Sequence, residues 1–322
     1  MFKNKLFKIL FAVLLLSPLP IYAYSNKVVV GGENVGIKVE SSGVLVVGFY
    51  NVGSSSPGKE AGLNLGDIIV KVDDTAINEI ADLSDYTSDK ESLTITYKRN
   101  NKTYTTMLKP KYEDNVYKTG LYVKNSIIGI GTLTFIDPQT NRYGALGHEI
   151  IEQTTGVKFE ISKGDIFKST ITGITKAEKG QVGEKNAKYD EDIKYGTIDK
   201  NDKTGIYGNY QDSYDKTDLT DVSNDINKGK ATITTVIEGS QKEEFEINII
   251  SVDLNHDTKN ILFEVTDPTL LEKGGGIVQG MSGSPIKQNG KLIGAVTHVV
   301  VDDPFKGYGI LITNMLKESE EG

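Results

Sequence analysis

The sequence contains no cysteine among its 322 residues. This absence excludes disulfide scaffolds, thiol nucleophiles and zinc sites built from cysteine. Histidine is scarce as well, because only His148, His256 and His298 occur, so few side chains can act as a base near neutral pH. The 36 basic residues are outnumbered by 44 acidic ones, which gives a formal charge of -8. Such a chain repels phosphate, and we expect no nucleic-acid partner.

The N-terminus has the pattern of an export signal. A lysine-rich start is followed by an apolar run over residues 9–16, which Pro18 and Pro20 then interrupt. The run is shorter than the roughly 20 residues that a membrane-spanning helix needs. We interpret residues 1–24 as a signal peptide, with a cleavage point after Ala23. The alternatives are an uncleaved membrane anchor and a buried helix of the fold.

Residues 28–110 have the pattern of a PDZ domain. Short apolar runs alternate there with Gly, Asn and Ser turns, and the segment 61–69 resembles the most recognisable stretch of that fold, with a turn at Gly66 and Asp67 before a buried strand. Val35, Gly36 and Ile37 lie where bacterial PDZ domains bind a peptide carboxylate and add the peptide as a strand. The alternative is another small β-rich domain with a Gly-Asp turn.

A boundary near residues 109–111 separates this segment from a second domain over 111–322. Its stretches 126–135, 160–180 and 230–265 are rich in Val, Ile, Thr and Phe, which favours strands. The polar stretch 186–230 predicts loops with short strands. The second domain is therefore expected to be mainly β.

The motif of residues 280–286, Gly-Met-Ser-Gly-Ser-Pro-Ile, is similar to the nucleophile turn of chymotrypsin-like proteases. Glycines on both sides let a tight turn project the Ser282 hydroxyl into a cleft. The backbone N–H groups of Gly280 and Ser282 would then form an oxyanion hole. A glycine-serine loop is commonplace by itself, so a base must also be present.

His148 is the best candidate for that base. It follows a predicted strand over 132–136 and stands in a glycine-rich turn, from which a neutral imidazole can take the serine proton. His298 lies at the far end of the strand after the nucleophile, and we interpret it as structural. His256 stands in a polar turn and is expected to be solvated.

The third member of a triad must be an acid that orients the imidazole. Asp267, at the end of a predicted strand over 261–265, is the candidate. The other interpretation is a helix N-cap, which is an ordinary role for Asp before a proline such as Pro268.

Together these segments resemble the stage IV sporulation protein B family, the SpoIVB peptidases of endospore-forming bacteria. The resemblance rests on residues 131–135, 144–148, 265–268, 275–286, 294–299 and 307–310, and it extends over nearly the whole chain. It implies a PDZ domain followed by a chymotrypsin-like double β-barrel. It also implies a triad of His148, Asp267 and Ser282.

The same resemblance implies a biological setting. The protein would be exported from the forespore into the space between the two sporulation membranes. There it would cleave itself and a membrane-bound regulator, which leads to activation of the processing of a mother-cell sigma factor. A serine peptidase needs no cofactor, and we expect no metal.

Other classes fit the sequence less well. HtrA-type proteases place the protease before the PDZ domain, the reverse of the order here. A site-2 metalloprotease needs a His-Glu-x-x-His site, and His148-Glu149 has no second histidine at that spacing. The alternative from another functional class is an exported PDZ scaffold with an inactive protease-like domain.

Overall fold

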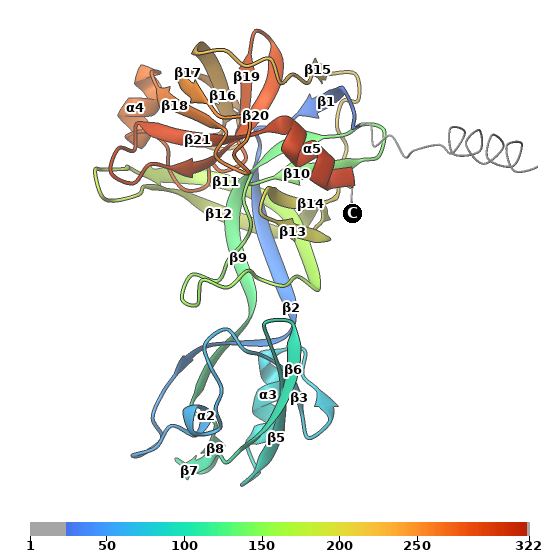
Figure 1. The fold of residues 1–322 in the computed structure, drawn as a ribbon, viewed down its shortest axis with the longest axis vertical. Coiled ribbons are helices and arrows are strands. Elements are labelled where there is room, and N and C mark those ends of the chain that lie inside the picture. The colour runs from blue at the N-terminus through green and yellow to red at the C-terminus, as the bar shows by residue number, and fades with distance from the viewer. Residues whose placement is uncertain (1–23, 321–322) are drawn as a thin grey trace, which may run out of the picture.

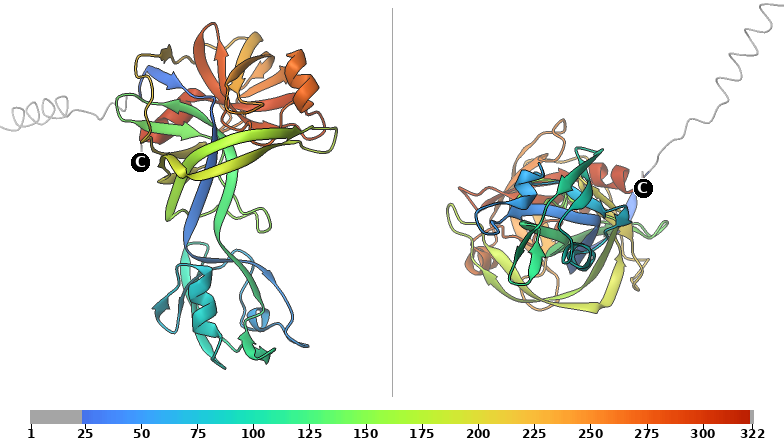
Figure 2. Two further views of the ribbon diagram at one scale, coloured as in Figure 1. Left: turned by 180° about the vertical axis from the view of Figure 1, so that it is seen from behind. Right: turned by 90° about the horizontal axis from the view of Figure 1, so that it is seen from below.

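The computed structural model of the chain describes residues 24–320. An upper and a lower body are connected by two long strands (Figure 1). Both ends of the described chain lie in the upper body, as the views in Figure 2 also show. The predicted signal falls almost entirely on residues 1–23, outside the described part. Within residues 24–320, no helix has the length and apolar character to cross a membrane.

The two connecting strands are β2 (Asn34–Phe49) and β9 (Leu121–Ile136), each with 16 residues. They pair antiparallel in two stretches, from Asn34 opposite Thr132 to Glu40 opposite Ser126 and from Leu45 opposite Lys124 to Phe49 opposite Leu121. At about 3.3 Å per residue, each strand is roughly 50 Å long and therefore serves both bodies. The register shifts between Glu40 and Leu45, where the strands leave the upper body.

The lower body is the PDZ domain. Its sheet has the order β9-β2-β3-β5-β6, with β4 beside β3 and a core that includes Val46, Ile69 and Ile95. The remaining elements of this part are β3 (Ile68–Val72), β4 (Thr75–Ala76), β5 (Leu93–Arg99), β6 (Lys102–Leu108), α2 (Pro57–Glu60) and α3 (Ile80–Thr87), followed by the hairpin β7 (Lys111–Glu113) and β8 (Val116–Lys118). Asn100 and Asn101 adopt left-handed conformations in the β5–β6 turn, as the predicted hairpin requires.

The Gly-Asp turn predicted from the sequence is present and is held by a buried ion pair. Gly66 has a φ of 89°, and strand β3 follows directly. The Asp67 side chain, only 1% exposed, accepts two hydrogen bonds of 2.6 Å from Arg99 and one of 2.8 Å from Asn64 N–H. This bidentate contact ties the turn to β5.

The first half of the upper body is an open sheet curved into a half-barrel. Its strands follow the order β13-β14-β10-β9-β2-β11-β12, and β1 pairs with both β9 and β15 at one end. Besides β2 and β9, it consists of β1 (Lys27–Val30), β10 (Arg142–Ala145), β11 (Lys163–Thr175), β12 (Glu184–Thr197), β13 (Lys200–Asp202), β14 (Gly205–Asn209) and β15 (Leu219–Asp221). The stretch 186–230, predicted as loops with short strands, also supplies most of the long strand β12.

The second half is a closed six-stranded barrel. Its order is β16-β17-β18-β21-β20-β19, and β19 pairs back onto β16. The strands are β16 (Gly229–Thr235), β17 (Glu243–Val252), β18 (Ile261–Val265), β19 (Pro285–Gln288), β20 (Lys291–Val299) and β21 (Lys306–Leu311), with helix α4 (Pro268–Gly274) between β18 and β19. Alternate side chains such as Ile247, Ile249 and Phe263 fill its interior.

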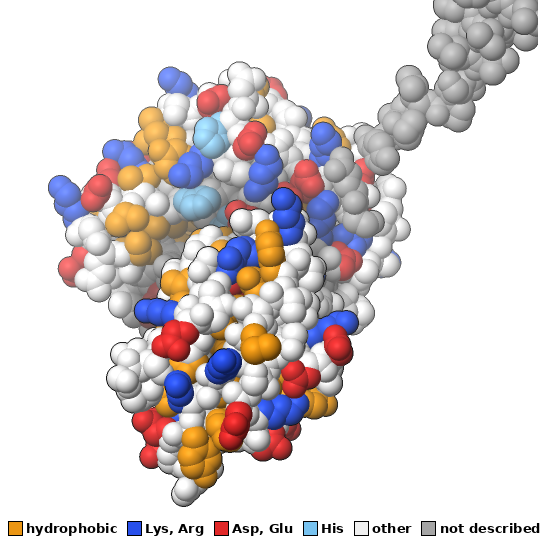
Figure 3. Space-filling view, turned by 60° about the horizontal axis from the view of Figure 1, so that its bottom comes forward, with side chains coloured by type: hydrophobic (Ala, Val, Ile, Leu, Met, Phe, Trp, Pro, Cys, Tyr) orange, Lys and Arg blue, Asp and Glu red, His pale blue; other side chains and the backbone are white. Residues whose placement is uncertain are grey.

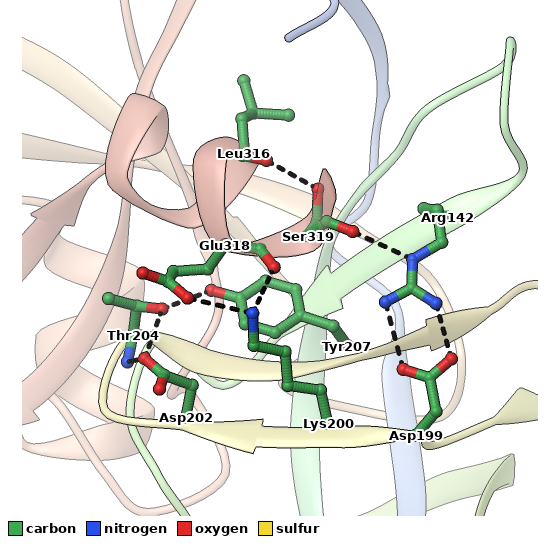
Figure 4. Close-up of polar contacts among 9 residues, drawn as sticks. All are labelled: Arg142, Asp199, Lys200, Asp202, Thr204, Tyr207, Leu316, Glu318 and Ser319. Carbon is green, nitrogen blue, oxygen red and sulfur yellow. Dashed lines mark hydrogen bonds and ion pairs between the residues drawn. The ribbon is translucent and has the colours of Figure 1, made fainter. Parts of the chain in front are cut away.

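The C-terminal helix α5 (Ile312–Glu320) leaves this barrel and docks on the half-barrel (Figure 4). Arg142 donates to the carbonyl of Ser319 and makes a bidentate contact with Asp199. Lys200 binds both the carbonyl and the carboxylate of Glu318. Cations thereby satisfy the free carbonyls at the end of α5 and tie the two halves together.

The predicted fold class is confirmed, because the chain is mainly β, with a PDZ domain and a closed barrel beside a half-barrel. The path of the chain differs from a simple succession of domains. β1 and the first half of β2 belong to the sheet of the upper body. The chain thus passes through the upper body before it enters the PDZ domain, so residues 27–40 belong to the sheet of the upper body although they precede the predicted boundary at residues 110 and 111.

Candidate active site

The turn that carries Ser282 is fixed on strand β9 by three backbone carbonyls. Thr132 donates from its hydroxyl to Gly280 O at 2.8 Å and from its N–H to Ser282 O at 2.9 Å. Thr134 donates from its hydroxyl to Gly283 O at 2.7 Å. Both threonines are fully buried. These contacts turn the carbonyls of the loop toward β9.

The N–H groups of Gly280 and Ser282 have no acceptor within residues 24–320. Gly280 has a φ of 91° and Gly283 one of 92°, which a residue with a side chain rarely adopts. A Cβ at Gly283 would also lie 2.1 Å from Thr132 O. The loop therefore needs glycine on both sides of the serine, and it leaves free the two donors predicted for an oxyanion hole.

The Ser282 hydroxyl is half-buried and donates to Thr297 O at 3.1 Å. Thr297 lies on β20, where the register with β21 shifts between Val296 and His298. Such a bulge changes the direction of the side chains next to it. The nucleophile candidate thus stands beside the end of β20.

His148 lies directly after a strained turn that packs on the serine loop. Leu146 and Gly147 have φ values of 69° and 68°, and a Cβ at Gly283 would lie 2.5 Å from Leu146 N. A left-handed conformation is unusual for leucine and is kept here by burial of its side chain. The turn that precedes His148 therefore packs against Gly283, the residue next to Ser282.

The hydrogen bond of His148 decides which nitrogen can act as a base. Its Nδ1 lies 2.9 Å from Glu149 O, and a carbonyl can only accept, so Nδ1 carries the proton. In the neutral ring the lone pair is then at Nε2. Burial lowers the pKa of the His148 imidazole, which favours this neutral form.

His298 lies beside His148, although the sequence suggested only a structural role. The two ring centroids are 5.4 Å apart, with the planes tilted by 43°. His298 Nδ1 is 2.9 Å from the Thr297 hydroxyl. Seen from the side of the PDZ domain, histidine side chains reach the surface of the upper body (Figure 3). His256, by contrast, is exposed in a turn, where its Nδ1 accepts from two backbone N–H groups.

Asp267 is the N-cap of helix α4. Its carboxylate accepts from Thr269 N–H at 2.9 Å and from Leu270 N–H at 3.1 Å. Among residues 24–320, neither His148 nor His298 forms a hydrogen bond with it. Ser282 binds Thr297 O and His148 binds Glu149 O, so the triad of His148, Asp267 and Ser282 stays a prediction.

The residues predicted to bind a peptide in the PDZ domain lie in the upper body instead. Val35, Gly36 and Ile37 pair with β9 on one side and with β11 on the other. A Cβ at Gly36 would lie 2.1 Å from the ring of Phe167. Both edges of β2 are occupied at these residues, so the predicted strand addition is incompatible with this arrangement.

Lys185 is a buried group near the site that the sequence did not reveal. It lies on β12, and its amine donates to Asn34 Oδ1 and Thr235 Oγ1, both at 2.8 Å. A Cβ at Gly280 would lie 3.1 Å from the Lys185 side chain. The aliphatic part of this lysine therefore packs closely against the serine loop. Burial lowers the pKa of Lys185 to about 7. Nothing in the polar stretch around it marks this lysine as buried.

The described part of the chain contains no cluster of three or more Asp, Glu or His side chains that could hold a metal ion. The chemistry that these residues can perform is acyl transfer. The arrangement offers a hydroxyl, a neutral imidazole and, within residues 24–320, two N–H donors without an acceptor.

Comparisons with known proteins identify the family of the chain. The family model described as SpoIVB peptidase S55 matches residues 115–316, and the PDZ domain model matches residues 34–109. No curated protein matches the chain. Among solved structures, the chain is similar to the crystal structure of Rv3671c protease in its inactive form, with 12% identity and a TM-score of 0.31 over 60% of this chain and 83% of that one. The S55 match spans more than half of the sequence, and the chain therefore belongs to the SpoIVB peptidase family, a family of serine peptidases.

Proposed function

We propose that this protein is an exported serine endopeptidase of sporulation signalling, with Ser282 as the nucleophile and His148 as the general base. The observation that carries the proposal is the serine loop itself. Its carbonyls are fixed on Thr132 and Thr134, its two N–H donors are free, and the turn of His148 packs against it.

The residues perform the reaction in two halves. Ser282 Oγ forms a bond to the carbonyl carbon of the peptide while His148 Nε2 takes the hydroxyl proton. The charge on the carbonyl oxygen is stabilised by the N–H groups of Gly280 and Ser282. The C–N bond then breaks as His148 gives its proton to the leaving amine. A water molecule repeats the sequence with the same base, which releases the acid and restores the serine.

The substrate class follows from the strand next to the nucleophile. β20 pairs with β19 up to Ala295, and the serine loop continues this contact to Val296 and the Thr297 carbonyl. The edge of β20 beyond Thr297 is not covered by β19 and begins beside Ser282. An extended peptide can add along that edge, which makes the chain's substrates proteins or peptides.

The wider setting rests on membership of the family and on the N-terminal pattern. The protein is exported across the forespore membrane into the intermembrane space, with its N-terminus removed or kept as an anchor. It cleaves itself and a membrane-associated regulator, and this cleavage leads to sigma-factor processing in the mother cell. The PDZ domain binds a peptide segment at a surface other than residues 35–37.

The second candidate function, a PDZ scaffold with an inactive protease domain, is less well supported. Decay of a protease would not be expected to keep Gly280 and Gly283 in conformations that only glycine adopts readily, nor two free N–H donors beside a serine.

The test is covalent labelling of the full chain with a fluorophosphonate, which phosphonylates activated serines with loss of fluoride. The parent chain should be labelled and should cleave itself or a casein substrate, whereas Ser282→Ala should do neither. Ser251→Ala replaces an exposed serine of β17 and serves as the matched control. Equal cleavage by the parent chain and by Ser282→Ala would refute the assignment of the nucleophile.

A further inference from the structure

The two N–H groups assigned to the oxyanion hole each belong to a peptide unit whose other polar end is a carbonyl. In a trans peptide the N–H and the C=O point in opposite directions, so a hydrogen bond to the carbonyl also fixes the direction of the N–H. The direction of the Gly280 donor thus depends on the carbonyl of Gln279. That of the Ser282 donor depends on the carbonyl of Met281.

The carbonyl of Met281 is held within the serine loop, whereas that of Gln279 is held by a distant strand. Ser284 N–H donates to Met281 O at 2.9 Å. Gln279 O accepts at 3.0 Å from the N–H of Lys185 on β12, and Gln279 N–H donates at 2.8 Å to the carbonyl just before β12. A short parallel pairing with β12 therefore fixes the peptide unit that carries the Gly280 donor.

The side chain of Lys185 anchors this end of β12 between the two halves of the upper body. The residue is only 4% exposed, and its amine donates to Asn34 Oδ1 and Thr235 Oγ1, both at 2.8 Å. Asn34 lies on β2 of the half-barrel and Thr235 on β16 of the closed barrel. The aliphatic stem packs against Gly280, where a Cβ would lie 3.1 Å from the lysine Cδ and 3.2 Å from its Cβ. Both the backbone and the side chain of Lys185 therefore hold the serine loop.

A lysine is a costly side chain for filling space at this position. Within the described residues its partners are an amide oxygen and a hydroxyl, and burial disfavours the charged form of the amine. An apolar side chain of similar length would fill the same space without that cost. Groups perturbed in this way gather at functional sites, which favours a role beyond packing.

We propose that Lys185 is a positioning residue for the oxyanion hole. This inference rests on the proposed function. The backbone N–H of Lys185 sets the direction of the Gly280 N–H, and the amine prevents the end of β12 from moving away from the serine loop. The contact acts mainly on the transition state, because the negative charge on the carbonyl oxygen develops there. Lys185 takes no part in the proton transfers between Ser282 and His148.

The test compares variants of the full chain in cleavage of casein near pH 8. Lys185→Met keeps the aliphatic stem and removes both hydrogen bonds of the amine. Its kcat should fall by about 10-fold with little change in KM, which is less than the roughly 100-fold effect of losing an oxyanion donor completely. The rate of fluorophosphonate labelling at Ser282 should fall by a similar factor, since the phosphonyl oxygen needs the same two donors.

Three further variants separate this role from a general effect on packing. Thr235→Val removes one acceptor of the amine and should reproduce part of the loss in kcat, whether or not Lys185→Met folds well. Thr234→Val removes the neighbouring hydroxyl of β16, which is buried and has no hydrogen-bond partner among residues 24–320, and should leave kcat unchanged. Lys188→Met replaces an exposed lysine of β12 and should also cleave at the parental rate.

Each contrary result has a separate meaning. Parental kcat and labelling rates in Lys185→Met would overturn the inference, as would a change in KM alone. Equal losses in Thr234→Val and Thr235→Val would do so too, because the rate would then depend on the packing of β16 and not on the amine. In all these cases the parent chain is still labelled at Ser282 and the proposed function stands. A parent chain without labelling or cleavage would overturn the proposed function and this inference together.

Discussion

Replacement of Lys185 by methionine should flatten the dependence of the protein's stability on pH between about 7 and 10.5. The lysine amine is buried, with Asn34 and Thr235 as its hydrogen-bond partners. Within residues 24–320 no carboxylate forms an ion pair with it. Burial therefore lowers the pKa of Lys185 from 10.5 to about 7 in the folded chain.

The sign follows from the protons bound in each state. Between the two pKa values the unfolded chain keeps the proton on Lys185 and the folded chain has released it. The free energy of unfolding must then rise with pH, by about 1.4 kcal/mol for each pH unit. The gain is complete above about 10.5 and is lost as the pH falls to about 7. From pH 7.5 to 9.5 it amounts to roughly 2 to 3 kcal/mol.

The measurement is urea unfolding, followed by circular dichroism, at several pH values in this range. The difference in unfolding free energy between the parent chain and Lys185→Met should increase with pH, whatever its absolute value. Lys188→Met replaces an exposed lysine on the same strand and should give a curve parallel to that of the parent. If the curves of the parent and Lys185→Met are parallel as well, the lysine is not buried as described.

Three further outcomes are expected. Thr132→Val removes the hydroxyl that holds Gly280 O, so kcat should fall by about 10-fold while the fold is kept; an unchanged kcat in steady-state cleavage would contradict this role. Arg99→Met leaves the buried carboxylate of Asp67 without its partner and should lower the unfolding free energy of the PDZ domain by about 3 kcal/mol, measured by urea unfolding. A second change, Asp67→Asn, should recover most of this loss. Asp267→Ala should cost about 1 kcal/mol through loss of the helix cap, and a melting temperature equal to that of the parent would argue against capping.

Local patterns predicted much of the fold. The turn at Gly66 and Asp67 and the hairpin at Asn100 and Asn101 depend on residues only a few positions apart, and the structure has both. The partners of β2 could not be predicted in this way. Its residues 35–37 look like an edge strand in the sequence, but strands about 95 and 130 residues further along the chain pair with both of its edges.

In the candidate site as well, local geometry was predicted from the sequence and long-range contacts were not. The motif around Ser282 predicted a glycine turn with free N–H groups, because that geometry is local. The neighbours of His148 depend on how the half-barrel meets the barrel, and spacing in the sequence did not predict that the His298 ring lies beside it. Of the two roles open to Asp267, the structure has the local one, the cap of α4.

The pairing of β2 with β9 in both bodies has a consequence for which segments of this protein can be deleted. Glu40 and Ser126 are register partners, so the whole PDZ domain is topologically an enlarged hairpin loop between them. Deletion from the N-terminus up to residue 110 would take β1 and β2 out of the protease sheet along with the PDZ domain. Excision of residues 41–125 with a short turn in their place would instead keep every strand of the upper body, and it would sever the PDZ domain from a catalytic unit that is still whole.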